Sequence, residues 1–320
     1  MNVLFFGTPD FAVPSLHAVA HSHHTLVGVV TAPDMPAGRG LKIRQSAVKE
    51  AALNYDVPLF QFENLEDSEL LEKCAQLKPD VAVVVAFRKL PEQLWKLPTK
   101  GTFNLHASIL PDYRGAAPLN WAIINGETET GLTTFFINEG IDTGNIINTR
   151  ILSIDEQDNL QTLHDKLAVE GAKLVVETLD NIETGNISPV SQQEIITSKN
   201  PELKRAPKIF KHHCRIDWMK SSAEIRNLIR GLSPVPGAFS VLKHKNGVTI
   251  TMKLLNASVS DINENLTPGQ VKFTKNAILV GTGNNKILEI SDIQPESRKR
   301  MFVEAFLNGI KETEGWYFEN

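Results

Sequence analysis

Short apolar runs alternate with segments of helical periodicity through the first half of the chain. The runs are apolar on both sides, as buried parallel strands are, and they occupy residues 2–6, 26–32, 58–62, 81–87, 102–106 and 132–137. Amphipathic helical patterns fill residues 45–55, 66–77 and 117–124, and a long one runs from about Leu160 to Ile182. This alternation predicts an α/β domain with a doubly wound, mostly parallel, Rossmann-like sheet.

The pattern changes after residue 187. Residues 188–207 are polar and punctuated by prolines, which predicts a linker between a first domain, residues 1–187, and a second, residues 208–320. The second domain has helical patterns at residues 222–232 and 299–309, and short strand patterns at residues 238–245, 248–259, 270–274, 277–282 and 286–293. We expect a small OB-like β-barrel, an architecture that commonly binds oligonucleotides.

Charge separates the two halves of the chain. Before Ser198 there are 14 Lys and Arg against 25 Asp and Glu, a net charge of −11; after it there are 19 against 12, a net charge of +7. A basic second half favours a polyanionic partner such as a nucleic acid, although a surface charged for solubility gives the same count. No apolar run approaches the roughly 18 residues of a transmembrane helix, and no signal peptide pattern is present, so we expect a soluble, cytoplasmic protein.

Several familiar sites are absent from the sequence. The segment GTPDFAVP after the first strand lacks the second and third glycines of a dinucleotide-binding turn, and no GxxxxGK[ST] phosphate loop occurs. Cys74 and Cys214, the two cysteines of the chain, have no partner at CxxC spacing. Neither a disulfide framework nor a cysteine-rich zinc site is therefore expected.

Asn104 and His106 are the candidate reactive groups. They lie two residues apart at the end of a predicted strand, so both point to one face of the sheet, at the edge where α/β proteins bind ligands. Asp142, in a loop after a neighbouring strand, can orient the imidazole, and a carboxamide can donate to an oxyanion. These groups suit acyl transfer. The nucleophile is expected to be an external one, because no protein nucleophile is evident: Ser108 lacks a nucleophile elbow and neither cysteine is near. The alternative is a surface histidine and an ordinary Asp-Thr-Gly turn.

The segment NLHASILPDYRGAAPLNWAIINGETETGLTTFFINEGIDTGNI resembles the signature of the 10-formyltetrahydrofolate-dependent formyltransferases. The resemblance implies that Asn104, His106 and Asp142 form the catalytic set. It implies that 10-formyltetrahydrofolate is the formyl donor, that Ser108, Ile109, Leu110 and Pro111 line the folate site, and that no metal takes part.

Further segments resemble the members of this family that formylate initiator methionyl-tRNA. They include FFGTPDFAVPSL, PAGRG, GLSPVPGAF and IQPESRKRMFVEAFLNG, and they extend over nearly the full length. The resemblance implies a monomer that forms N-formylmethionyl-tRNA for translation initiation, and the tRNA contacts expected are Arg39, Lys42, Arg44 and Lys208. Phe87-Arg88 departs from the Tyr-Gly common beside the pterin. Two alternatives remain open: a formyltransferase for a sugar-nucleotide amine, and a folate- or RNA-binding protein without catalysis.

Overall fold

The computed structural model describes residues 1–37, 42–199, 202–262 and 264–320, which form two compact units. The first unit comprises Met1–Gly115, Thr130–Ser153 and His164–Arg205; the second comprises Ala116–Glu129, Ile154–Leu163 and Ala206–Asn320. The chain therefore passes between the units several times. The expected division at residues 187 and 208 stays a prediction. Segments 116–129 and 154–163, which lie within the expected first domain, group with the second unit.

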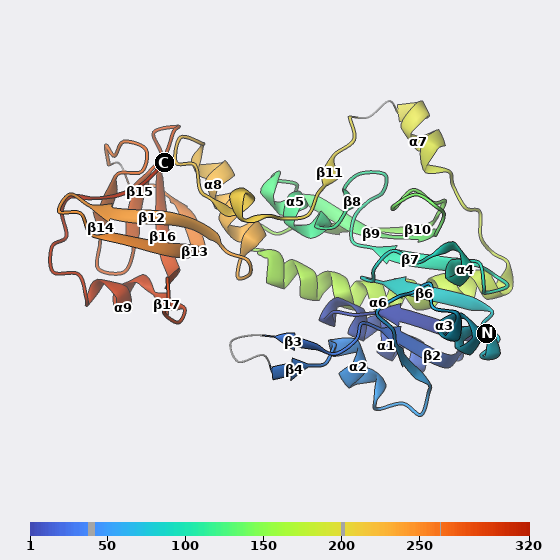
Figure 1. The fold of residues 1–320 in the computed structure, drawn as a ribbon. Helices are drawn as coiled ribbons and strands as arrows, with labels where there is room; N and C mark the ends of the chain where they lie inside the picture. Colours follow the sequence, from blue (N-terminus) through green and yellow to red (C-terminus); the bar gives the residue numbers. More distant parts are fainter. Residues whose placement is uncertain (38–41, 200–201, 263) are drawn as a thin grey trace. The chain divides into compact units, whose positions relative to one another are not determined.

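A seven-stranded sheet in the order β10-β9-β7-β6-β1-β2-β5 forms the centre of the first unit (Figure 1). Its strands are β1 (Asn2–Gly7), β2 (Thr25–Thr31), β5 (Leu59–Gln61), β6 (Val81–Val85), β7 (Thr102–His106), β9 (Glu129–Phe136) and β10 (Ile146–Ser153). The five neighbouring strands β5, β2, β1, β6 and β7 pair in parallel, whereas β9 pairs antiparallel with β7. The mostly parallel, doubly wound sheet is confirmed; β10 was not predicted.

Helices cover both faces of this sheet. Leu70 and Cys74 of α3 (Ser68–Gln76) and Leu94 of α4 (Glu92–Trp95) pack in one buried cluster with β1 and β6. On the other face, a Cβ added at Gly171 of α6 (Leu160–Thr184) would lie 2.7 Å from the Leu105 side chain, so α6 packs closely there. The long helix is confirmed. The first unit also contains η1 (Asp10–Ala12), α1 (Val13–Ala20), α2 (Ala47–Ala52), α7 (Gln192–Lys199), the hairpin β3 (Met35–Ala37) and β4 (Lys42–Arg44), and β8 (Arg114–Gly115).

The second unit is a nearly closed antiparallel barrel, which confirms the OB-like prediction. Its strand order is β14-β15-β16-β13-β12-β18, and a bridge between Gln270 and Tyr317 brings the two ends together. The strands are β12 (Ala238–His244), β13 (Thr249–Ser260), β14 (Val271–Phe273), β15 (Ile278–Gly281), β16 (Ile287–Pro295), β17 (Met301–Phe302) and β18 (Trp316–Phe318). The two-residue strand β11 (Arg205–Ala206) precedes them and is not part of the barrel sheet. Trp218 fills the core and donates its indole N–H to the Ser240 hydroxyl at 3.0 Å.

Short helices complete the second unit: α5 (Pro118–Ile124), η2 (Lys211–Cys214), α8 (Ser222–Leu232) and α9 (Val303–Leu307). A reciprocal cap starts α8, since Ser221 accepts from the Glu224 N–H and the Glu224 carboxylate accepts from Ser221. The helix expected over residues 299–309 was too long, because residues 301–302 pair with β16 instead. Within the described residues no helix is long and apolar enough to cross a membrane.

Candidate functional site

Strand β7 presents Asn104 and His106 on the same face of the sheet. Successive side chains of a strand alternate between faces, and Asn104 pairs in register with Val84, which packs in the cluster with α3 and α4. Leu105, between them, points to the α6 side. Asn104 is half-buried, whereas His106 is buried at the last residue of the strand. The strand thus places an amide one pleat before an imidazole, as the sequence predicted.

Both nitrogens of the His106 ring face oxygen atoms. Nε2 lies 2.9 Å from the backbone oxygen of Tyr113, and Nδ1 lies 3.8 Å from Oδ2 of Asp142. A carbonyl oxygen only accepts, so Nε2 carries a proton in this contact. Nδ1 faces the Asp142 carboxylate at more than hydrogen-bonding distance. The structure therefore brings His106 and Asp142 together, 36 residues apart in sequence.

Asp142 reaches the imidazole by a route that the strand-end argument did not foresee. Because β9 is antiparallel to β7, Thr133 lies beside His106, and the carboxyl end of β9 lies beside the start of β7. The loop of residues 137–145 has to return along the sheet to bring Asp142 back. Asp142 adopts a φ of 54°, and its Oδ2 accepts from the Gly115 N–H at 3.0 Å. The loop conformation, and not the end of a parallel strand, places the carboxylate.

The expected folate-lining segment is fastened to β9. Thr133 donates its hydroxyl to the Ser108 backbone oxygen at 2.7 Å and accepts from the Leu110 N–H at 3.2 Å. The Ser108 hydroxyl donates to the Asp112 oxygen at 2.7 Å. Ser108, Leu110 and Pro111 are buried and Ile109 is half-buried. Three hydrogen bonds thus hold this segment beside His106, and its contact with folate stays a prediction.

A cavity of about 750 Å³ opens among the loops that follow β5, β6 and β9. Its lining includes Arg88, Lys89, Trp95 and Glu139, and Glu139 belongs to the same loop as Asp142. Arg88, at the departure from the family pattern, donates to the backbone oxygens of Phe62 and Glu63. Burial lowers the pKa of its guanidinium. Arg88 thus joins two walls of a cavity whose size suits a small-molecule ligand.

Sequence reasoning missed Gln192 and Arg114. Gln192, on α7 within the segment expected to be a linker, is 1% exposed. Its Nε2 donates to the backbone oxygens of Asp142 and Gly144, at 3.0 and 2.8 Å. Its Oε1 accepts from Nε and Nη2 of Arg114, at 3.0 and 2.5 Å. Glutamine is usually exposed, so nothing in the residue type indicated this contact.

The structure describes the four expected tRNA contacts to different extents. Arg39 lies outside the described residues, and Lys42 is placed by its backbone in β4. Arg44 is exposed, and its backbone pairs with Met35 in the β3–β4 hairpin. Lys208 is exposed in the second unit. Their contact with tRNA stays a prediction.

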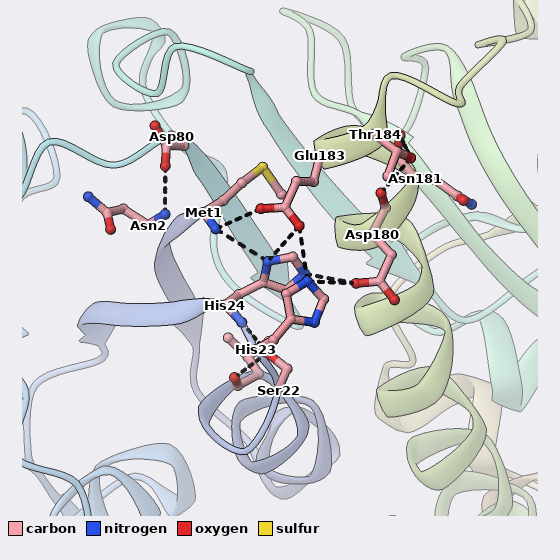
Figure 2. A network of polar contacts seen from close by, with 11 residues as sticks. Met1, Asn2, Ser22, His23, His24, Asp80, Asp180, Asn181, Glu183 and Thr184 are labelled. Atoms are coloured by element: carbon pink, nitrogen blue, oxygen red, sulfur yellow. Dashed lines mark hydrogen bonds and ion pairs between the residues drawn. The ribbon is translucent and has the colours of Figure 1, made fainter.

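Among the described side chains, one group of potential metal ligands has its donor atoms within 4.8 Å of one another: His23, His24 and Glu183. Figure 2 shows both imidazoles facing α6. His23 Nε2 lies 3.0 Å from Glu183, and His24 Nε2 lies 3.0 Å from Asp180. Glu183 also accepts from the Met1 nitrogen at 3.2 Å. His23, His24 and Glu183 all contact other protein groups, so the cluster works as a polar clamp between α6 and the turn before β2.

Known proteins are similar to the chain along nearly its whole length. The family model described as "Formyl transferase" matches residues 1–179, and the model "Formyl transferase, C-terminal domain" matches residues 208–311. The "Methionyl-tRNA formyltransferase" of Bacteroides fragilis is 43% identical over 317 residues, 99% of this chain and 97% of that protein. The protein of the same name from Azobacteroides pseudotrichonymphae is 45% identical over 310 residues, 96% of this chain and 95% of that protein.

Solved structures share the fold at lower identity. An N-formyltransferase from Helicobacter canadensis, in complex with folinic acid and dTDP-3-aminofucose, has a TM-score of 0.66 and 21% identity, over 90% of this chain and 98% of that chain. HypX from Aquifex aeolicus, in complex with tetrahydrofolic acid, has a TM-score of 0.61 and 21% identity, over 97% of this chain and 48% of that chain. At such identities the likeness concerns the fold alone.

Proposed function

Because this chain belongs to the formyl transferase family, we propose that it formylates the α-amino group of methionine on initiator methionyl-tRNA, with 10-formyltetrahydrofolate as the donor. The product is N-formylmethionyl-tRNA for translation initiation. One observation carries the proposal: identity of 43% or more with methionyl-tRNA formyltransferases extends through both units, over 99% and 96% of the chain. The convergence of His106 and Asp142 supplies chemistry that fits this reaction.

The proposed reaction begins when the free amine attacks the formyl carbon of the donor. Negative charge then develops on the formyl oxygen, where the Asn104 amide and the protonated His106 ring stabilise it by hydrogen bonding and charge. The Asp142 carboxylate attracts the ring electrostatically and helps to accept the amine proton. The tetrahedral intermediate collapses with cleavage of the bond between carbon and the folate nitrogen, which leaves with a proton. These steps use the chain's own side chains as donors and acceptors.

We place the donor beside segment Ser108–Pro111 and the cavity of about 750 Å³, because both adjoin the loop that carries Asp142. Arg88 and Lys89 on the cavity wall supply positive charge for the glutamate carboxylates of a folate. For the acceptor, we propose that Arg39, Lys42, Arg44 and Lys208 contact tRNA phosphates.

The test is formylation of methionyl initiator tRNA by the purified chain with 10-formyltetrahydrofolate. A dTDP-linked amino sugar in place of tRNA serves as the alternative acceptor. Asn104→Ala should lower turnover by about 10² to 10³, the usual cost of losing one oxyanion donor. Turnover on the amino sugar without turnover on tRNA would replace the proposed acceptor, and an Asn104→Ala protein with unchanged turnover would remove the amide from the mechanism.

A further inference from the structure

Gln192 closes a ring of contacts around the Asp142 carboxylate. Its amide binds the Asp142 backbone oxygen, and its carbonyl binds Arg114. The residue after Arg114 is Gly115, whose N–H donates to Asp142 Oδ2. One side chain therefore holds both the backbone of the carboxylate residue and the strand that fixes its oxygen.

We propose that Gln192 is a positioning residue, which sets the place of the Asp142 carboxylate against His106. The inference rests on the proposed function, because it assigns a role within that reaction. Gln192 touches neither His106 nor the expected ligand segment in the described contacts, so it acts through Asp142 and Arg114.

The geometry leaves the amide no freedom. A primary amide has two N–H donors and two acceptor positions, and Gln192 uses all four, on the oxygens of Asp142 and Gly144 and on two nitrogens of Arg114. The side chain is 1% exposed, so water does not replace a lost partner at low cost.

The loop that Gln192 holds needs this support. Asp142 has a φ of 54°, in the left-handed region that disfavours residues other than glycine. A Cβ added at Gly144 would lie 1.6 Å from the Phe136 backbone oxygen, so the loop packs tightly on β9 there. With Gly144 fixed, the two amide hydrogen bonds decide how Asp142 is turned toward His106.

Arg114 adds a positive charge to the ring of contacts around Asp142. Burial lowers the pKa of its guanidinium, the charge of Arg205 lowers it further, and the charge of Asp142 opposes both effects. The Arg114 cation and the Gly115 N–H thus both lie on the Asp142 side of this ring of contacts. Gln192 Oε1 fixes that guanidinium through a two-pronged contact.

The test compares Gln192→Glu, Gln192→Ala and the control Gln193→Glu. In Gln192→Glu, a carboxylate oxygen replaces the N–H donor and faces two backbone oxygens, while the acceptor for Arg114 remains. Gln193 is exposed on the same helix and bonds only Thr197 among the described contacts. We expect single-turnover formylation to fall about 10²-fold in both Gln192 variants, the scale of a misplacement near 1 Å, with KM for tRNA within threefold. The control should match the wild type.

A double-mutant cycle with Asp142→Asn separates positioning from general damage to the fold. If Gln192 acts through Asp142, Gln192→Glu should cost less than threefold in the Asp142→Asn background, because the carboxylate it positions is already gone. A full 10²-fold cost in that background, or wild-type rates in both Gln192 single variants, would overturn the inference.

The inference about Gln192 remains testable if the proposed acceptor is wrong and if one variant does not fold. If the wild type formylates another amine and not methionyl-tRNA, the function fails and the same cycle is measured on that amine. If Gln192→Ala does not fold, Gln192→Glu, which keeps the length and the Arg114 contact, decides the question with its melting temperature measured alongside.

Discussion

Replacing Asp142 by Asn removes one charge from the site and little else. Oδ2 of Asp142 accepts from the Gly115 N–H at 3.0 Å in the structure, and the Asn oxygen can take its place in this hydrogen bond. The attraction between a carboxylate and the His106 ring, 3.8 Å apart, is lost. Asp142→Asn therefore isolates the electrostatic contribution of this residue to formyl transfer.

The strength of the attraction between Asp142 and the His106 ring follows from their distance and their burial. Two unit charges about 4 Å apart attract by about 4 kcal/mol at an effective dielectric constant of about 20, and by about 1 kcal/mol in bulk water. The His106 side chain is 7% exposed and the Asp142 side chain 15%, so the site lies between these limits. Since about 1.4 kcal/mol corresponds to a factor of ten, the protonated ring in the transition state loses about 5- to 10³-fold stabilisation.

The assay is single-turnover formylation of methionyl initiator tRNA at saturating 10-formyltetrahydrofolate, which reports the chemical step. We expect Asp142→Asn to slow this step by about 5- to 10³-fold, with tRNA affinity unchanged. Asp56→Asn, at an exposed position of the first unit, is the matched control for loss of one carboxylate. A rate for Asp142→Asn within threefold of the wild type would refute the electrostatic role.

Two further predictions concern the clamp at α6 and the second unit. Burial lowers the pKa of His24 below its ordinary 6.5, and hydrogen bonds from His23 and the Met1 nitrogen lower the pKa of Glu183 to about 2. At both groups the unfolded chain binds protons more readily than the folded chain, so the folded state loses stability as the pH falls. The loss through His24 begins below about pH 6.5, and the loss through Glu183 begins below about pH 4.5. His24→Gln should flatten the fall of melting temperature between pH 7 and 5, whereas the exposed His21→Gln should not. Lys208→Ala should weaken tRNA binding and reduce its salt dependence by about one counterion. Lys275, which is also exposed in the second unit, is the control, and an equal effect of Lys275→Ala would show that Lys208 acts through the general charge of the surface and not through a contact.

Periodicity predicted the elements of the fold well, because burial on two sides leaves a plain apolar run. The strands of the parallel core follow the runs in the sequence, and α6 and α8 begin where their patterns begin. The direction of β9 was not accessible, since an apolar strand reads the same in either orientation. Nor was β10, whose exposed and half-buried positions form no such run.

The site was predictable where one strand holds it. Asn104 and His106 share a face through the two-residue period of β7 alone. Asp142 was chosen as a residue that follows a neighbouring strand, but its contact with His106 depends on a loop that turns back along an antiparallel strand, which the sequence did not predict. The contact of His106 Nε2 with the Tyr113 oxygen depends in turn on the path of residues 107–113.

Gln192 marks the limit of inference from sequence. Its helix, α7, has Ile195 packed against the cluster of Leu110, Phe135 and Ile146, but two adjacent isoleucines among polar residues give no helical period. A polar side chain is buried when its partners are backbone oxygens of another segment, and no local pattern encodes those partners. A segment that looks like a linker thus supplies a fully bonded amide to the loop of Asp142.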